Sequence, residues 1–299
     1  MLRFDGAAAA VKQNLGGYDD MYELSLFTGA GGGLLGTHLL GWTPVGYVEF
    51  DDYCQRIIAQ RIEDGILPRA PIFGDVRTFA SEGYAASYTG LVDVITAGFP
   101  CQPFSTAGKR AGVDDSRNMW PATLDVVRVV RPRFAFLENV PGLLSSGYFG
   151  TILGDLAESG YDARWRILSA AEMGAPHKRN RLWIVADASS GGFRESKQNI
   201  RTRELDPDRC CEDVADAEGT GLSQRANATS RQQKNQGVIG RLERSDWWQV
   251  EPDVGRMADG VASRVDRLKA IGNGQVPLCA AIAFLLLAGD YEISLDNNH

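Results

Sequence analysis

The chain has 299 residues, of which 44% are hydrophobic, and its formal net charge is -7. A chain of this length can bury one large core, and its composition is that of an ordinary globular protein. Five cysteines without a CxxC pair, together with only three histidines, exclude a disulfide framework and a zinc cluster, so we expect no metal and a reduced, cytoplasmic setting.

Neither export nor membrane insertion is expected. The longest apolar run, residues 278–288, is shorter than the roughly 20 residues that a bilayer requires. The N-terminus lacks the basic-then-apolar pattern of a signal peptide. Residues 1–20 hold an alanine run without clear periodicity, and we interpret them as a poorly ordered, flexible arm.

From residue 21 onward, short apolar runs alternate with amphipathic stretches. The runs are MYELSLF (21–27), VGYVEF (45–50), LVDVITAG (91–98), FAFLEN (134–139) and RLWIVA (181–186). They are typical of strands separated by helices and predict an α/β protein with a mostly parallel sheet covered on both faces. PATLDVVRVV (121–130) is predicted to be a crossover helix. We expect one domain over 21–186, against which residues 255–299 pack back.

A glycine-rich segment, FTGAGGGLLG (27–36), follows the first predicted strand. Its Gly31, Gly33 and Gly36 satisfy G-x-G-x-x-G, and Glu49 and Asp75 end the next two apolar stretches. Such glycines let a ligand approach the N–H groups of a helix N-terminus, while a carboxylate can bind ribose hydroxyls. Both NAD and S-adenosylmethionine carry such a ribose, so a dinucleotide oxidoreductase stays open here. A turn that only permits tight packing is equally open.

The next informative segment is FPCQPFS, into which the strand LVDVITAG runs directly. Pro100 and Pro103 stiffen this loop, which presents the thiol of Cys101 at the carboxyl end of the sheet, where ligands of open α/β sheets bind. A thiol becomes a useful nucleophile when cationic neighbours lower its pKa. Cys54 and Cys279, by contrast, are interpreted as buried hydrophobic residues.

Five segments in this order resemble the motifs of the DNA (cytosine-5-)-methyltransferase family, across residues 21–290. They are FTGAGG (27–32), GFPCQPFS (98–105), ENV (138–140), HKRNR (177–181) and GNGQVP (272–277). One such match could arise by chance, but five in order could not. The resemblance implies a Rossmann-like S-adenosylmethionine-dependent methyltransferase fold. His177 departs from the glutamine that the family more often has at that position.

The resemblance also implies roles for four side chains. Cys101 would attack carbon 6 of cytosine, and Glu138 would stabilise the resulting charge at ring nitrogen 3. Glu138 ends an apolar strand, where burial would raise its pKa and favour the protonated donor. Arg179 and Arg181 alternate along an extended stretch, so both would point to one face of the strand and meet one ligand. Arg181 would bind the exocyclic oxygen of cytosine, while Arg179 would help place the ring and keep the thiolate charged.

The implied cofactor is S-adenosyl-L-methionine. The resemblance assigns its methionine part to a cradle, its ribose to Glu49, and its adenine to Asp75, Val76 and the ring of Phe50. Asn273 would close the pocket from the C-terminal side. The cradle consists of Phe27, Gly29, Ala30, Gly31 and Gly32.

The apolar pattern collapses after residue 186, and 187–254 is interpreted as a small, irregular target-recognition region. Residues 176–203 hold seven basic and two acidic side chains, and residues 221–245 hold five and one. The net charge of -7 disfavours phosphate binding, but these local excesses of positive charge can still bind phosphates. Interleaved Gln, Asn and Ser could read base edges. A solvated linker is the alternative interpretation.

Duplex DNA is therefore the expected partner of a monomeric enzyme, with base flipping to expose the target cytosine. A restriction endonuclease partner is compatible with the resemblance. Two alternatives remain: an RNA cytosine-5 methyltransferase of the same family and a non-catalytic DNA-binding relative. The arginine motif is HKRNR (177–181) and the closing motif is GNGQVP (272–277). The insert between them favours duplex DNA, and retention of Cys101 and Glu138 favours an enzyme.

Overall fold

The computed structural model describes residues 17–100, 118–188 and 274–289, and three single positions, 266, 270 and 272. A seven-stranded sheet has the strand order β3-β2-β1-β4-β5-β7-β6. Every pair is parallel except those that β7 makes with β5 and β6. The strands are β1 Tyr22–Leu26, β2 Thr43–Val48, β3 Ile72–Phe73, β4 Val94–Ala97, β5 Phe134–Asn139, β6 Asp162–Leu168 and β7 Arg181–Asp187.

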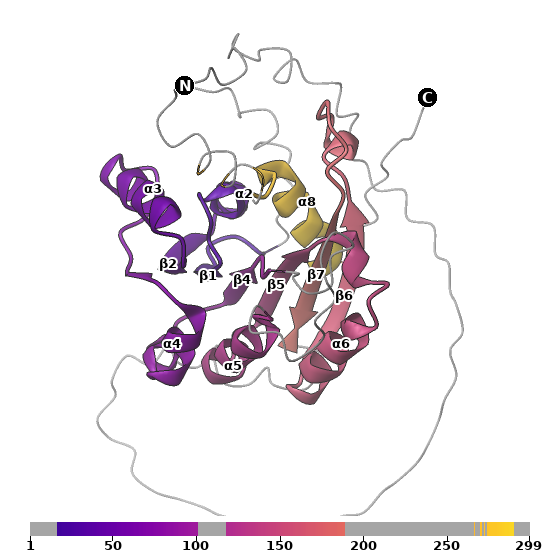
Figure 1. Ribbon diagram of the computed structural model, residues 1–299, viewed down its shortest axis with the longest axis horizontal. Coiled ribbons are helices and arrows are strands. Elements are labelled where there is room, and N and C mark those ends of the chain that lie inside the picture. Colours follow the sequence, from indigo (N-terminus) through magenta and orange to yellow (C-terminus); the bar gives the residue numbers. More distant parts are fainter. Residues whose placement is uncertain are drawn as a thin grey trace, which may run out of the picture.

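Helices cover both faces of this sheet (Figure 1), which confirms the predicted Rossmann-like fold class. Helices α2, α3 and α8 lie on one face, and helices α4, α5 and α6 lie on the other. Their bounds are α2 Gly32–Leu39, α3 Asp52–Glu63, α4 Val76–Ser81, α5 Trp120–Val130, α6 Tyr148–Glu158 and α8 Pro277–Ala288. Short 3-10 turns occur at η1 Tyr84–Tyr88, η2 Pro141–Leu143 and η3 Ala171–Met173.

Strand β5 shows how its sequence supplies both faces of the core. Its side chains alternate, so Phe134 and Phe136 pack with α8 while Ala135 and Leu137 join the cluster around α5 and α6. The Phe284 ring of α8 meets both phenylalanine rings, with centroids 5.4 Å away in each case. Helix α8 therefore packs against β5, and most of the remaining predicted C-terminal segment, 255–299, lies outside the described residues.

Local sequence also sets where the helices begin. The Asp51 carboxylate accepts hydrogen bonds from two N–H groups in the first turn of α3, and the Asp75 carboxylate accepts one, from the Arg77 N–H, at the start of α4. Helix α5 has Pro121 in its first turn, where the missing N–H costs nothing, and it ends at Arg131 in a left-handed conformation. This helix coincides with the crossover helix predicted from the sequence.

Two features differ from the sequence-based expectations. Strand β6 was not predicted, because it lies at the sheet edge and most of its side chains are exposed, so it carries no apolar run. Tyr18 belongs to the predicted flexible arm, yet its hydroxyl donates to the Ala288 carbonyl at 2.6 Å and its own carbonyl accepts from Trp42. The end of this segment is therefore held through Tyr18, and residues 1–16 lie outside the described part.

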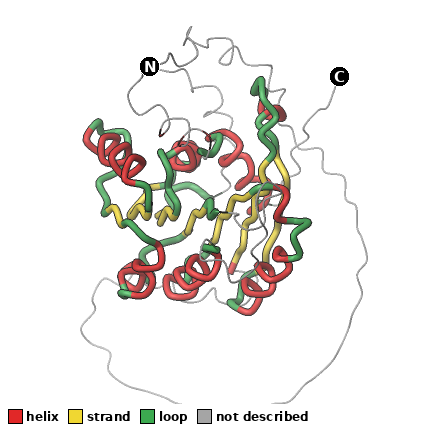
Figure 2. Tube along the Cα trace, viewed as in Figure 1, coloured by secondary structure: helices red, strands yellow, loops and turns green. Residues whose placement is uncertain are grey.

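The tube in Figure 2 shows the loops that follow the strands at their carboxyl ends, which form one edge of the sheet. Strands β1, β2, β4 and β5 are mutually parallel, so Leu26, Val48, Ala97 and Asn139 all end at this edge, where open α/β sheets bind their ligands. Among the described helices, none is both long and apolar enough to cross a membrane. Residues 189–265 are outside the description, so the target-recognition region stays a prediction.

Candidate active site

The predicted glycine cradle lies between β1 and α2. Phe27, Gly29 and Gly31 all have positive φ angles, of 53°, 58° and 87°. A non-glycine residue rarely adopts this conformation, and such strain is found most often at functional sites. Helix α2 starts after Gly31 without a side-chain cap, so its first N–H groups face the turn. This arrangement suits an anionic or carboxylate-bearing ligand.

Glu49 lies beside the cradle, at the end of β2, and its side chain is buried. One carboxylate oxygen accepts from the Gly29 N–H at 2.6 Å and the other from the Asp51 N–H at 2.8 Å. Each oxygen keeps a second lone pair for a ligand. Backbone bonds thus fix the carboxylate at the place where the sequence predicted a ribose-binding acid.

The remaining predicted adenine-site residues follow along the same edge. The Phe50 ring is 72% exposed, as a ring that stacks on a ligand would be. Asp75 pairs with Arg77 at 2.7 Å, and that hydrogen-bonded partner lowers the pKa of the Asp75 carboxyl. The Val76 side chain is buried in the core, so only its backbone could meet a ligand. Asn273 lies outside the described residues.

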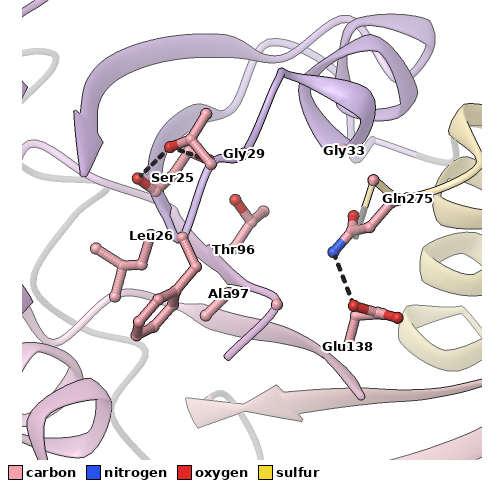
Figure 3. Close-up of a pocket in the computed structure, with 12 residues that line it drawn as sticks. Ser25, Leu26, Gly29, Gly33, Thr96, Ala97, Glu138 and Gln275 are labelled. Carbon is pink, nitrogen blue, oxygen red and sulfur yellow. Dashed lines mark hydrogen bonds between the residues drawn. The ribbon is translucent and has the colours of Figure 1, made fainter. Parts of the chain in front are cut away.

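A pocket connects the cradle to β5 (Figure 3). Residues from β1, the cradle, β4, β5 and the loop before α8 line it. Gly29 presents open space to it, since a Cβ built there would meet no atom within 4 Å. The lining residues are Ser25, Leu26, Phe27, Thr28, Gly29, Gly33, Thr96, Ala97, Gly98, Glu138, Gly274 and Gln275.

Glu138 is the buried acid of this pocket, with 9% of its surface exposed. Arg181 pairs with it through Nε and Oε1 at 2.9 Å, and the amide of Gln275 donates to Oε2 at 3.4 Å. Burial raises the pKa of Glu138 despite the opposing charges of Arg181 and Arg179. Burial and the two arginines thus act on the Glu138 carboxyl in opposite directions, and its role as a proton donor stays a prediction.

Arg179 reaches the same region by a different backbone path from the one expected. Its φ is 37°, so it is not part of the extended strand, which begins at Arg181. Its guanidinium donates to the carbonyls of Gly272, at 2.8 Å, and Gly274. The expectation that the two arginines alternate along one strand face is therefore wrong, although both guanidinium groups act electrostatically on Glu138. Arg179 joins the arginine motif to the closing motif.

The loop predicted to carry the nucleophile follows a firmly held residue. Phe99 is buried against Trp120, with ring centroids 5.4 Å apart, and its carbonyl accepts from the Asn139 side chain at 3.1 Å. Cys101, two residues further along, lies outside the described residues. Asn139 was predicted only as a member of ENV, and its anchoring of the loop start is visible only in three dimensions.

The other two cysteines in the described residues are buried, as the sequence predicted. Cys54 is 7% exposed and Cys279 is 4% exposed. Burial raises the pKa of the Cys279 thiol to about 12, which keeps it protonated and unreactive at neutral pH. Neither therefore competes with Cys101 as a candidate nucleophile.

Sequence reasoning missed Gln275 as a site residue. GNGQVP was recognised as a closing motif, but only Asn273 was assigned a role within it. The glycines at 32, 33 and 98 were the sequence feature that pointed to such a residue, because each leaves room for Gln275. No sequence pattern states which residue fills such a space.

Comparison with known proteins places these features in a family. The family model described as C-5 cytosine-specific DNA methylase matches residues 21–254. Type II methyltransferase M.NgoMIV of Neisseria gonorrhoeae is 35% identical over 168 residues, covering 55% of this chain and 51% of the relative. M.NaeI of Lentzea aerocolonigenes is 34% identical over 166 residues, covering 54% and 39%. The chain thus spans about half the length, or less, of these relatives.

Solved structures give a weaker similarity. The structure of a putative DNA modification methyltransferase encoded within an E. coli prophage is 25% identical, covers 63% of this chain and 52% of its own, and gives a TM-score of 0.46. The fold assignment accordingly depends on strand order and on the family match.

Proposed function

We propose, because the chain belongs to the C-5 cytosine-specific DNA methylase family, that it methylates carbon 5 of a flipped-out cytosine in a specific double-stranded DNA sequence. The observation that carries this proposal is the placement of Glu138. Its buried carboxyl pairs with Arg181 and lines the same pocket as the glycine cradle. The neighbouring strand β4 leads into the loop that holds Cys101.

The residues around the cradle fit S-adenosyl-L-methionine. Gly29 faces open space, the Glu49 carboxylate is fixed beside it, and the Phe50 ring is exposed at the next position. We expect Glu49 to bind ribose hydroxyls, Phe50 to stack on the adenine, and Asp75 with the Val76 backbone to contact the adenine edge. When bound, this cofactor supplies an electrophilic methyl group on a sulfonium.

Cys101 makes the acceptor carbon reactive. Its thiolate forms a bond to carbon 6 of cytosine, and the electron pair of the 5,6 double bond moves toward carbon 5 and the ring. Carbon 5 would take the methyl group as its bond to the sulfonium breaks, with the electron pair left on a neutral thioether sulfur, and carbon 5 would then lose its proton to a base. The bond between sulfur and carbon 6 breaks, which restores the thiolate and the aromatic ring.

Glu138 and the two arginines act on the rest of the ring. The protonated Glu138 donates its proton, or a hydrogen bond, to ring nitrogen 3 while negative charge develops there. Arg181, whose Nε lies 2.9 Å from Glu138 Oε1, binds the exocyclic oxygen next to that nitrogen in this proposal. Arg179 adds positive charge, which favours the thiolate form of Cys101.

A direct test combines methyl transfer with covalent trapping. Purified protein with isotopically labelled S-adenosyl-L-methionine should label cytosine in duplex DNA, and DNA containing 5-fluorocytosine should trap a covalent complex. The trap forms because a fluorine at carbon 5 cannot leave as a proton does. Cys101→Ala should abolish both signals, and bisulfite sequencing of the methylated DNA should give the target site.

Cys54→Ala is the matched control, because this cysteine is buried away from the pocket. It should keep both signals. If RNA becomes labelled and DNA does not, the chain is an RNA methyltransferase instead. Tight DNA binding with neither labelling nor trapping would mark a non-catalytic relative.

A further inference from the structure

Gln275 fills a notch between three glycines of two different elements. A Cβ built at Gly32 would lie 2.6 Å from the Gln275 carbonyl oxygen, and one at Gly33 would lie 2.5 Å from its side-chain oxygen. A Cβ at Gly98 would lie 2.9 Å from the amide nitrogen. Real Cβ atoms do not come this close to other atoms, so a side chain at Gly32 would collide with the backbone of residue 275, and one at Gly33 or Gly98 would displace the Gln275 side chain from its observed position.

The side chain of Gln275 spans from this notch to the catalytic acid. Figure 3 shows it between Gly33 and Glu138, with its amide pointing at the carboxyl. The amide nitrogen donates to Glu138 Oε2 at 3.4 Å, while Arg181 binds Oε1 at 2.9 Å. Both carboxyl oxygens are therefore held, one from the arginine motif and one from the closing motif.

We propose that Gln275 is a positioning residue, whose amide sets the orientation of the Glu138 carboxyl and connects it to the glycine cradle. This inference rests on the proposed function. Gln275 is not a catalytic residue in this proposal, because it acts on the cytosine only through Glu138. The backbone of the closing loop reinforces the connection, because Gly272 and Gly274 accept hydrogen bonds from Arg179.

The competing possibility is that Gln275 only fills space above the glycines. Gln275→Met separates the two, because methionine has a similar length and volume but no amide. A positioning role predicts a roughly tenfold fall in kcat for Gln275→Met, the effect of losing one modest hydrogen bond. The KM for S-adenosyl-L-methionine should change less than about twofold, since the substitution leaves the backbone of residue 275 close to Gly32.

The pH profile gives a readout that a space-filling role would not change. The amide N–H stabilises the charged form of Glu138 and so lowers its pKa, against the larger effect of burial. Without the amide the protonated form is favoured further, and the pKa rises. Because the proposed reaction needs protonated Glu138, the pH above which kcat falls should move to higher pH in Gln275→Met.

Gln60→Met is the matched control. Gln60 is exposed on α3 and also donates its amide to a carboxylate, that of Asp64, at 2.9 Å. The Gln60→Met variant loses an amide–carboxylate hydrogen bond far from the pocket. Its kcat and pH profile should equal those of the unsubstituted protein. A Gln275→Met variant that matches this control in both measurements would overturn the positioning role.

A measurement without turnover keeps this inference separate from the proposed function. Carbon-13 NMR of glutamate-labelled protein, with Glu138→Gln to assign the signal, follows the titration of the Glu138 carboxyl directly. Gln275→Met should raise that pKa even if no methyl transfer is found. An unchanged titration would refute the inference, whereas absent labelling and trapping would refute only the proposed function.

Discussion

Glu23 is a carboxyl buried beneath the pocket that the proposed chemistry does not use. Only 1% of its surface is exposed, and its two oxygens accept hydrogen bonds at 2.5 Å from the hydroxyls of Thr37 and Thr96. Thr37 lies in α2 and Thr96 in β4, and Thr96 also lines the pocket. Glu23 therefore joins the helix of the cradle to the strand that leads to the nucleophile loop.

This carboxyl should make stability depend on pH. Burial raises the pKa of Glu23 from its ordinary 4.5 to about 7, so the folded state binds a proton more tightly than the unfolded state. The free energy of unfolding should consequently fall as pH rises from about 4.5 to 7, by about 3 kcal/mol for this group alone. Its contribution is complete below pH 4.5 and lost above the folded-state pKa.

Glu23→Gln isolates that contribution. The amide keeps the shape and can still bond to both hydroxyls, but it cannot ionise. Urea denaturation at a series of pH values should show the variant becoming more stable than the unsubstituted protein as pH rises from 5 to 8. A difference between the two proteins that stays constant over this range would show that Glu23 is charged in the folded state.

At the scale of elements, the contact between α2 and α8 brings the closing loop to the cradle. Gly36 permits this contact, since a Cβ there would lie 2.5 Å from the Pro277 carbonyl oxygen and 2.8 Å from the Ala280 Cβ. Gly36→Ala should therefore push the two helices apart, with a loss of about 1–3 kcal/mol in stability. Thermal unfolding measures the loss, and weaker binding of S-adenosyl-L-methionine should accompany it.

Gly154→Ala tests whether this effect is specific to the contact. Gly154 lies on the exposed side of α6, where an added Cβ would meet no atom within 4 Å. Alanine should raise stability there by about 0.5–1 kcal/mol, because it lowers the entropy of the unfolded chain. Equal destabilisation by both substitutions would contradict the packing explanation.

The elements that the sequence predicted are those whose pattern reports burial. Strands β1, β4, β5 and β7 are apolar because both sheet faces are covered, and α5 shows the helical period. Strand β6 escaped prediction because its edge position leaves it exposed. Arg179 was misplaced because a left-handed residue before a strand leaves no trace in spacing. Gln275 was missed because its partners are distant in sequence.

At the scale of the whole molecule, the net charge of the chain disfavours the DNA binding that the proposed function requires. The net charge of -7 repels DNA as a long-range field, yet two stretches of the sequence carry a strong excess of basic residues. The second stretch, 221–245, lies entirely outside the described residues. Its five basic side chains against one acid make it the clearest candidate for phosphate contacts.

Salt dependence tests that assignment without requiring its structure. Each phosphate contact contributes about 0.9 to the slope of log affinity against log salt concentration. Replacing all five basic residues with glutamine should reduce the slope for duplex DNA by up to about 4.5, measured by fluorescence anisotropy. The residues are Arg225, Arg231, Lys234, Arg241 and Arg244.

The affinity for S-adenosyl-L-methionine serves as the internal control, because the residues expected to bind it come from the cradle and from Glu49, Phe50 and Asp75. That affinity should stay unchanged in the five-fold variant. If the slope for DNA is also unchanged, 221–245 does not contact phosphates, and a solvated linker becomes the better interpretation. The contacts with DNA phosphates would then have to come from the other basic stretch, 176–203, which includes the arginine motif beside Glu138.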